Sequence, residues 1–312
     1  MSVTGSPESI AGKPLISTPV LRRVGTRAAD YLRLTKPRIA VMALLTVVIG
    51  YVLGSAGQVQ IVPLLHALFG IALVAAGSSA LNQWIEQDRD RQMQRTVSRP
   101  LPAGRLSSRE ALLFGLATGL GGLLYLAWAS NLLTVLFAAA TLVMYVAIYT
   151  PLKSRTALCT AVGAIPGALP PVLGWTAAGG AADLRALTLF SLLFLWQFPH
   201  FLAIAWLYRH DYEQAGFRML PAASKTRHVT GLLAVAYATA LIPVSLLPAE
   251  VALAGPRFTL TAIALGLMYL LSAIRFLLDE SSEPARALIL TSVVYLPLIL
   301  IAMTWDHVQL LR

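Results

Sequence analysis

Charged side chains are scarce in this sequence of 312 residues. Asp, Glu, Lys and Arg together make up 12% of the chain, whereas they make up roughly a quarter of an ordinary soluble domain. Cysteine is almost missing, and the single Cys159 excludes an internal disulfide framework and a cysteine-rich metal site. These shortages exclude a disordered chain, a coiled coil and an ordinary soluble enzyme.

Apolar residues take the place of the missing charges. They make up 57% of the chain, and the mean hydropathy is +0.71. A hydrocarbon core about 30 Å thick is crossed by roughly 20 apolar residues in a helix. Nine such stretches predict an all-α, polytopic membrane protein: about 39–55, 61–81, 111–129, 131–149, 157–178, 187–207, 229–248, 258–278 and 285–304. The predicted organisation is a polar cytoplasmic tail over 1–37 and a transmembrane domain over 38–312.

Acidic residues are also few, 14 against 24 Lys and Arg. The basic residues lie between apolar spans, so an anionic membrane surface explains them and no nucleic-acid partner is predicted. Nine spans place 21 of the 24 Lys and Arg on the side of the N-terminus. The positive-inside rule therefore predicts a cytoplasmic N-terminus in a bacterial plasma (inner) membrane. Two long polar loops, about 82–110 and 208–228, fall on the same cytoplasmic side.

The first polar loop begins with a row of oxygen ligands. If the second span continues as a helix, Asn82, Glu86 and Asp90 recur every four residues and share one face. Carboxylates one turn apart repel unless a cation joins them, and Mg²⁺ prefers such oxygen ligands together with substrate phosphates. Arg95 and Arg99 follow at the same spacing, and arginine binds phosphate bidentately. The pattern predicts a magnesium–diphosphate site.

A solvated helix end is the alternative interpretation of this loop. Glu86, Asp88 and Asp90 would then pair with neighbouring arginines at the surface, where ion pairs contribute little. Asn82 and Glu86 directly follow an apolar span, however, and polar groups in that position are costly and usually functional. The position of the row therefore favours the binding site.

The second polar loop offers a further carboxylate. His200 and Asp211 are eleven residues apart, about three helical turns, so they share a face if the sixth span persists as a helix. Asp211 is a candidate ligand of a second Mg²⁺ on the same diphosphate. His200 has a second interpretation as an ordinary core histidine bonded to a backbone carbonyl.

Two other spans carry unusual residues. At the end of the fourth span, Tyr145 and Tyr149 share a stripe that leads to Lys153, and Lys153 and Arg155 either complete an anion site or anchor the span at the membrane surface. The fifth span holds three prolines and three glycines between residues 163 and 175. That composition excludes a straight helix and predicts broken backbone beside a cavity.

Together these motifs resemble the UbiA superfamily of intramembrane prenyltransferases and, within it, the branch that farnesylates haem. The superfamily's Asn-x-x-x-Asp-x-x-x-Asp motif matches Asn82, Glu86 and Asp90, with Glu86 in place of the usual aspartate. The resemblance covers about 34–300. The motifs that carry it are Leu34-Thr35-Lys36-Pro37-Arg38, Met93-x-Arg95-Thr96-x-x-Arg99-Pro100-Leu101, Gly167-Ala168-Leu169-Pro170-Pro171-x-x-Gly174-Trp175, Trp196-Gln197-x-Pro199-His200-Phe201, Tyr208-Arg209-x-Asp211-Tyr212 and Tyr295-Leu296-Pro297.

The resemblance implies a Mg²⁺-dependent enzyme that transfers a farnesyl group from farnesyl diphosphate to a vinyl group of haem b. The products would be haem o, used to build the cofactor of haem-copper oxidases, and diphosphate. The implied partners are these two substrates, the lipid bilayer and a downstream haem a synthase. A relative that prenylates a quinone or chlorophyll precursor is the first alternative, and a membrane transporter is the second.

The resemblance also assigns roles to individual residues. It implies that the metal ligands at the catalytic centre are Asn82, Glu86, Asp90 and Asp211. The residues implied to bind diphosphate are Arg95, Arg99, Lys153 and Arg155. The residues implied to line the pocket for the acceptor and the allylic cation are Tyr145, Tyr149, Trp196, His200 and Tyr208.

Overall fold

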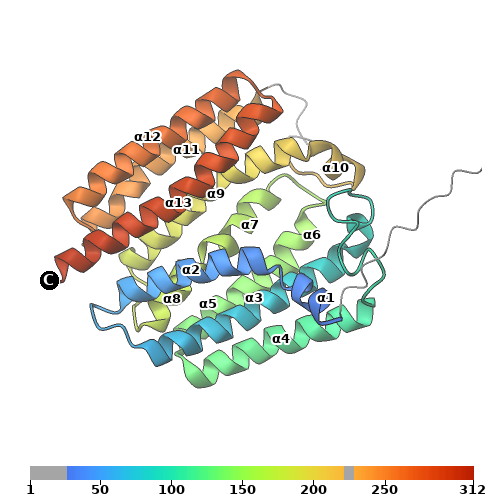
Figure 1. Ribbon diagram of the computed structural model, residues 1–312, viewed down its shortest axis with the longest axis horizontal. Helices are drawn as coiled ribbons and strands as arrows, with labels where there is room; N and C mark the ends of the chain where they lie inside the picture. Colours follow the sequence, from blue (N-terminus) through green and yellow to red (C-terminus); the bar gives the residue numbers. More distant parts are fainter. Residues whose placement is uncertain (1–26, 221–227) are drawn as a thin grey trace, which may run out of the picture.

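The computed structural model describes residues 27–220 and 228–312, and within these ranges the chain is a bundle of helices that run roughly parallel and antiparallel to one another (Figure 1). The elements are α1 (Arg27–Leu34), α2 (Pro37–Gly54), α3 (Ile61–Asp90), α4 (Ser108–Ala129), α5 (Leu132–Val143), the π-helix η1 (Met144–Tyr149), α6 (Thr150–Leu152), α7 (Cys159–Ala168), α8 (Pro170–Ala177), α9 (Leu184–Leu207), α10 (Arg209–Gln214), α11 (Val229–Glu250), α12 (Pro256–Leu278) and α13 (Ser282–Leu310).

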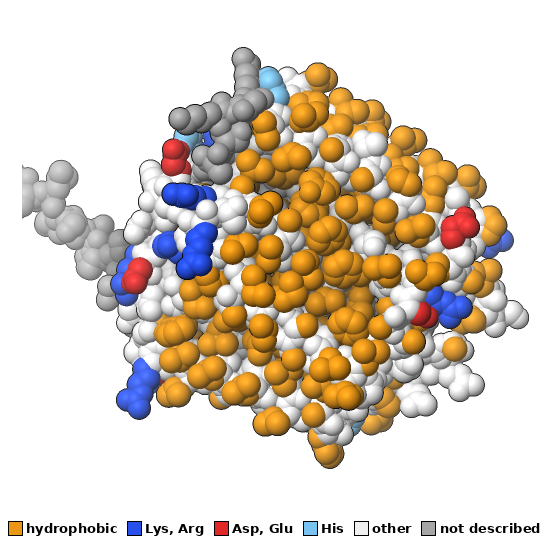
Figure 2. Space-filling view, turned by 180° about the vertical axis from the view of Figure 1, so that it is seen from behind, with side chains coloured by type: hydrophobic (Ala, Val, Ile, Leu, Met, Phe, Trp, Pro, Cys, Tyr) orange, Lys and Arg blue, Asp and Glu red, His pale blue; other side chains and the backbone are white. Residues whose placement is uncertain are grey.

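The predicted membrane spans are confirmed. In the described residues, eight helices are long and apolar enough to cross a bilayer. The ninth predicted span, 157–178, is present as the two short helices α7 and α8. Hydrophobic side chains cover the middle of the surface, and Lys, Arg, Asp and Glu gather towards its two ends (Figure 2). The chain is a multi-pass membrane protein.

Local sequence signals begin several of these helices. Ser107 and Glu110 form a capping box at the start of α4, in which each side chain receives a backbone N–H of the other residue. Asp183 accepts the backbone N–H groups of Arg185 and Ala186 at the start of α9. Such caps satisfy N–H groups that the first turn of a helix otherwise leaves without partners.

The helices pack through small residues where their backbones approach closely. On α3, a methyl group at Gly77 would collide with the backbone of Gly119 on α4, so these two spans pack through small residues. On α2, a methyl group at Gly50 would collide with the carbonyl oxygen of Pro171 on α8, and Gly174 approaches Val47 in the same way. These contacts hold α2 against α8 and α3 against α4.

The break predicted in the fifth span is present. The helix is interrupted at Leu169, between α7 and α8, because Pro170 has no N–H to continue the hydrogen-bond ladder and disfavours helical backbone before it. The side chain of Gln197 on α9 closes over Gly167, and its Nε2 donates to the carbonyl oxygen of Ala164. The expectation that this break lines a cavity stays a prediction.

Two helices differ from the expectation. The sixth span ends at Leu207, and after Tyr208 a separate short helix, α10, carries Asp211. The condition under which His200 and Asp211 would share one helical face, a sixth span that continues as a helix, is therefore not met. The fourth span contains a π-helical turn over η1, which the spacing of Tyr145 and Tyr149 does not reveal.

The predicted polar tail is partly a helix. Residues 1–26 lie outside the described residues, whereas Arg27–Leu34 forms α1. Leu34 is fully buried against Ala80 and Leu101, and Asp30 accepts a hydrogen bond from Arg105 Nε at 2.9 Å. The domain boundary at residue 37 stays a prediction. In Figure 1, α1, the loop after α3 and α10 lie at one end of the bundle, and the C-terminus lies at the other.

Candidate active site

The predicted row of oxygen ligands forms on the last turns of α3. Because α3 runs unbroken to Asp90, Asn82, Glu86 and Asp90 share one face, and they are 1%, 4% and 0% exposed. The alternative of a solvated helix end holds only for Asp88, which pairs with Arg91 at 2.8 Å and has a side chain 81% exposed. The row itself is buried.

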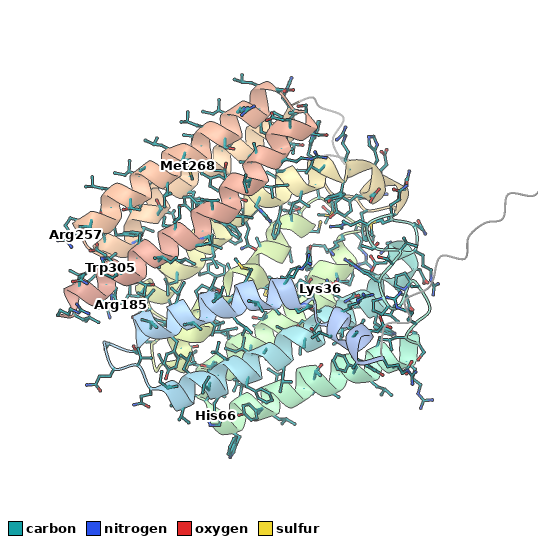
Figure 3. All side chains as sticks on the ribbon, in the orientation of Figure 1. Lys36, His66, Arg185, Arg257, Met268 and Trp305 are labelled. Carbon is teal, nitrogen blue, oxygen red and sulfur yellow. The ribbon has the colours of Figure 1, made fainter. Side chains whose placement is uncertain are left out.

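Each member of the row is matched by a cation from a different part of the chain. Lys36 Nζ donates to Asn82 Oδ1 at 2.7 Å. Lys153 Nζ lies 2.8 Å from Glu86 Oε1, and Arg99 Nη1 donates to Asp90 Oδ2 at 2.6 Å. Buried carboxylates are tolerated when they are paired in this way. Lys36 lies at the end of the bundle that also carries α1 (Figure 3).

One oxygen of the row has no partner. Asp90 Oδ1 is sealed from solvent and receives no hydrogen bond. An unpartnered buried carboxylate oxygen is costly, and a hard divalent cation such as Mg²⁺ would satisfy it. Within the described residues no three His, Cys, Asp or Glu side chains group closely enough to hold a metal by themselves. The row therefore fits Mg²⁺ only if an amide oxygen such as that of Asn82 and oxygens from outside the protein complete the ligand set.

The two lysines beside the row have opposite electrostatic environments. Burial lowers the pKa of Lys36 from its ordinary value, and the positive charges of Arg99 and Lys153 lower it further. Burial alone would lower the pKa of Lys153 as well, but Tyr149 and Glu86 beside it raise that pKa above its ordinary value. Lys153 is therefore a firmly charged partner of Glu86.

The π-helical turn places two tyrosines beside this pair. The rings of Tyr145 and Tyr149 lie 5.3 Å apart, and Lys153 Nζ lies 4.6 Å from the centre of the Tyr149 ring. Gly163 on α7 faces the ring of Tyr149, and a Cβ atom at this position would collide with the ring. A π turn inserts one extra residue into a helix and often occurs at functional sites. Directly after it, Thr150 Oγ1 accepts from Asn82 Nδ2 at 3.1 Å.

Arg95 joins the two polar loops. Its Nη2 donates to the hydroxyl of Tyr212 at 3.0 Å, and its guanidinium carbon lies 4.8 Å from the ring centre of Tyr208. Asp211, next to Tyr212, is partly buried. In the described part of the chain its carboxylate forms no salt bridge, and it shares none of the cations that pair with the row. Arg155 is exposed and no salt bridge is recorded for it in the same ranges. The roles predicted for Asp211 and Arg155 stay predictions.

The residues predicted to receive the acceptor fall into three groups. Tyr145 and Tyr149 lie beside the row, and Tyr208 lies under Arg95. Trp196 and His200 form the third group on α9: their rings stack with centres 5.4 Å apart, and both bond to Ser292 on α13. The structure brings the first two groups to the polar end and keeps the third between α9 and α13.

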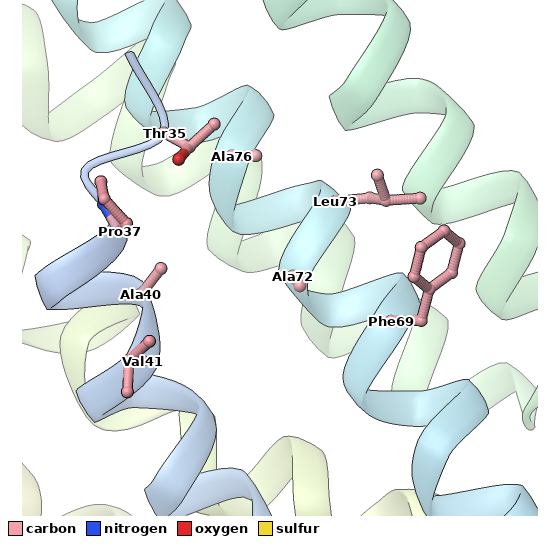
Figure 4. A pocket seen from close by; sticks show the side chains of 8 residues that line it. All are labelled: Thr35, Pro37, Ala40, Val41, Phe69, Ala72, Leu73 and Ala76. Carbon is pink, nitrogen blue, oxygen red and sulfur yellow. The ribbon is translucent and has the colours of Figure 1, made fainter. Parts of the chain in front are cut away.

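Two pockets lie around the start of α2. A cationic pocket of about 400 Å³ adjoins the row and shares Lys36 and Arg99 with it. Its lining residues are Arg33, Lys36, Gln83, Ser98, Arg99, Pro100 and Arg105. An apolar pocket of about 250 Å³ lies between α2 and α3, with Phe69 and Ala76 on its α3 wall (Figure 4). The cationic pocket thus lies on the side of the row that Lys36 and Arg99 occupy.

Residue reasoning from the sequence missed the role of two residues at the row. Lys36 belongs to a motif of the sequence, but nothing near it in the sequence predicts its hydrogen bond to Asn82, which lies 46 positions away. The one local sign of a special role is that this lysine directly precedes the proline at the start of the first span. Thr150 carried no signal, because a threonine before a proline is common at a helix end and its contact with Asn82 bridges two distant spans.

Comparisons with known proteins show which family the chain is similar to. The model of the UbiA prenyltransferase family matches residues 43–300. A protoheme IX farnesyltransferase of Solibacter usitatus is 44% identical over 287 residues, which cover 89% of this chain and 98% of that protein. A protoheme IX farnesyltransferase of Koribacter versatilis is 41% identical over 294 residues, which cover 91% and 95%.

Solved structures share the fold at low sequence identity. A digeranylgeranylglyceryl phosphate synthase has a TM-score of 0.74 at 17% identity, covering 91% of this chain and 99% of its own. A UbiA homologue from Archaeoglobus fulgidus bound to GPP and Mg²⁺ has a TM-score of 0.65 at 18% identity, covering 88% and 99%. Because the family model spans most of the chain and the relatives exceed 40% identity, the chain belongs to the UbiA prenyltransferase family.

Proposed function

We propose that this protein transfers the farnesyl group of farnesyl diphosphate to a vinyl group of haem b, forming haem o and diphosphate. The observation that carries the proposal is the buried row of Asn82, Glu86 and Asp90, matched by three cations at the polar end of a membrane bundle. The acceptor is inferred from the relatives, which are named protoheme IX farnesyltransferases.

The residues of the row would hold Mg²⁺, with Asp211 as a candidate ligand of a second ion. When bound, Mg²⁺ supplies positive charge that stabilises the leaving diphosphate. Lys36, Lys153 and Arg99 now neutralise the row, and in the complex they would turn to the diphosphate oxygens. Charge that grows on these oxygens during bond cleavage then meets donors that are already in place.

The chemistry needs no nucleophile from the protein. Cleavage of the C1–O bond of farnesyl diphosphate gives an allylic cation and diphosphate. The haem vinyl group attacks C1 with its π electrons, and the resulting cation next to the porphyrin ring takes up water and loses a proton to become a hydroxyl group. The rings of Tyr145 and Tyr149, beside Lys153 and the row, are placed to stabilise the allylic cation.

The membrane location of the protein follows from the same arrangement. The C-terminal end of α3, the helix α10 and the cationic pocket lie at the end of the bundle that carries α1. Most Lys and Arg gather on that side, so we place it in the cytoplasm and the bundle in a bacterial inner membrane. Farnesyl diphosphate then reaches the row with its charged group at the aqueous end and its apolar chain in the membrane. A haem a synthase is the proposed consumer of the product.

A product assay tests the proposal. Purified protein in lipid vesicles is incubated with haem b, farnesyl diphosphate and Mg²⁺, and the extracted haem is analysed by mass spectrometry. We expect a haem enlarged by one farnesyl group and one hydroxyl group. A second sample offers a prenyl-accepting phenol instead of haem. Unchanged haem together with a prenylated phenol would assign the protein to quinone precursors, and cation flux without any prenylated product would support a transporter.

A further inference from the structure

Two hydrogen bonds define the tautomer of His200 on α9. Ser292 Oγ donates its proton to the carbonyl oxygen of Ile289 at 2.6 Å, and His200 Nδ1 lies 2.7 Å from the same Oγ. A serine hydroxyl has one proton to donate. Oγ therefore accepts at the contact with His200, and Nδ1 carries the proton. The neutral imidazole ring then has its lone pair on Nε2.

The plane of this ring is held by its neighbours. The indole of Trp196 stacks on it at an interplanar angle of 18°, and Trp196 Nε1 donates to the backbone oxygen of Ser292 at 2.9 Å. The hydroxyl of Tyr269 on α12 donates to the backbone oxygen of Trp196 at 3.0 Å. Three helices, α9, α12 and α13, thus hold one imidazole in a fixed position.

The lone pair on Nε2 is accessible to a ligand. In the described parts of the chain no hydrogen bond reaches His200 Nε2, and this atom is not one of the sealed, unpartnered polar atoms. His307 on α13 is the contrasting case, because both of its ring nitrogens are sealed inside the protein without partners. A neutral imidazole whose Nδ1–H is held by an acceptor and whose Nε2 is open is the usual form of a histidine metal ligand.

His200 and the acidic row both lie near the polar end of the bundle. His200 precedes the end of α9 by seven residues, about 10 Å along a helix, and Asn82 precedes the end of α3 by eight, about 12 Å. Both helices end at the polar end of the bundle (Figure 1). Ala164 on α7 contacts Gln197, and Gly163 on α7 contacts Tyr149, so α7 connects the surroundings of His200 with those of the row.

We infer that His200 Nε2 is an axial ligand of the iron of the haem substrate, and that Ser292 is a positioning residue that sets the tautomer and orientation of His200. The inference rests on the proposed function, which supplies an iron porphyrin as the acceptor. Ligation forms one Fe–N bond and leaves the porphyrin carbon skeleton unchanged. It would fix the height of the macrocycle in the bundle, so that a vinyl group at its edge meets C1 of the farnesyl chain.

Haem absorption and electron paramagnetic resonance spectra test this inference. Ferric haem b is titrated into the purified protein and into His200→Ala, Ser292→Ala and Ser292→Thr. The matched control is His66→Ala, which removes another membrane-embedded histidine at the opposite end of the bundle, bonded to the Tyr125 hydroxyl (Figure 3). Farnesylation of haem is measured separately on each protein, and imidazole is added to His200→Ala to replace the missing side chain.

The expected result is a nitrogen-ligated haem spectrum in the unchanged protein and in His66→Ala, which is lost in His200→Ala and restored by imidazole. Ser292→Ala should weaken haem binding about 10–100-fold, the usual effect of removing the group that orients a metal ligand, and Ser292→Thr should keep most of the affinity. If the unchanged protein makes haem o but its bound haem has the same spectrum as in His200→Ala, His200 does not ligate the iron. That result would overturn the inference and leave the proposed function intact. Absence of haem o in every sample would instead refute the proposed function.

Discussion

Arg99 donates to only one of the two carboxylate oxygens of Asp90, at 2.6 Å, and the other oxygen is sealed inside the bundle without a partner. This half-satisfied carboxylate lies at the end of the row on α3, beside a pocket lined by cations. Burial without full pairing is unfavourable for a carboxylate, so the site is poised to bind a further cation together with an anionic substrate.

Removing the charge of this carboxylate should abolish catalysis. We expect Asp90→Asn to lower the rate of diphosphate release by at least about 100-fold, because one metal ligand and its charge are lost. Asp88→Asn is the matched control, since Asp88 is exposed two residues earlier and pairs only with Arg91. Diphosphate release and thermal unfolding are measured for both. Equal activity of the two variants would contradict the proposed role of the row.

Removal of metal should stop the reaction without unfolding the protein. Chelation by EDTA is expected to abolish haem o formation, and added Mg²⁺ should restore it. The protein should stay folded, because Lys36, Lys153 and Arg99 already neutralise the row in the absence of metal. Circular dichroism and thermal unfolding with and without EDTA check the second part. Full activity in EDTA would exclude metal-dependent catalysis.

Lys36 should contribute mainly to binding of the diphosphate. Its side chain now donates to Asn82 and lines the cationic pocket, from which it would face the substrate anion in the complex. We expect Lys36→Met to raise KM for farnesyl diphosphate about 10–100-fold, the effect of losing one charged hydrogen bond. Arg38→Gln removes an exposed positive charge two residues later and serves as control. Steady-state kinetics that show the same KM for both variants would rule out this role.

Arg95 should align the second polar loop with the row. Tyr212→Phe removes the hydrogen bond between its hydroxyl and Arg95 but keeps the ring, and Arg95→Lys keeps the charge but loses the planar guanidinium over Tyr208. We expect a larger loss of kcat/KM in Arg95→Lys than in Tyr212→Phe. If Arg95 contributes only positive charge to the loop, Arg95→Lys will behave like the unchanged protein, which the same kinetic series would reveal.

The approach of α2 to α8 should be intolerant of any side chain. Gly50→Ala would push a methyl group into the carbonyl of Pro171, and we expect a loss of about 1–3 kcal/mol in the free energy of unfolding. Gly121→Ala on α4 is the matched control, because a methyl group there meets nothing within 4 Å; replacing a helical glycine by alanine should be neutral or stabilising. Thermal unfolding in the same detergent compares the two.

The sequence predicted the parts of this protein that depend on local periodicity. Apolar length located the spans, and the four-residue spacing of Asn82, Glu86 and Asp90 placed them on one face once α3 continued to Asp90. Three prolines close together predicted the break between α7 and α8 because each removes a backbone N–H from the helical hydrogen-bond ladder. These are properties that neighbouring residues determine among themselves.

Contacts between distant spans could not be predicted from such spacing. Lys36 reaches Asn82 across 46 positions, and Ser292 reaches His200 across 92. The separation of α9 from α10 at Tyr208 was equally hidden, because the residues around it have ordinary helix propensities. Which side chains meet at the site depends on how the helices pack, and a single sequence does not encode that in its periodicity.

The π-helical turn of η1 has a consequence for the angular position of everything that follows it. Each residue turns an α-helix by about 100°, whereas a π turn spreads one extra residue over the same rotation. If Met144–Tyr149 kept all its residues but wound as a regular α-helix, Thr150 and Lys153 would be rotated by about that angle around the helix axis, away from Asn82 and Glu86. The helix would survive such rewinding, but its ammonium group and its hydroxyl would be directed at different neighbours.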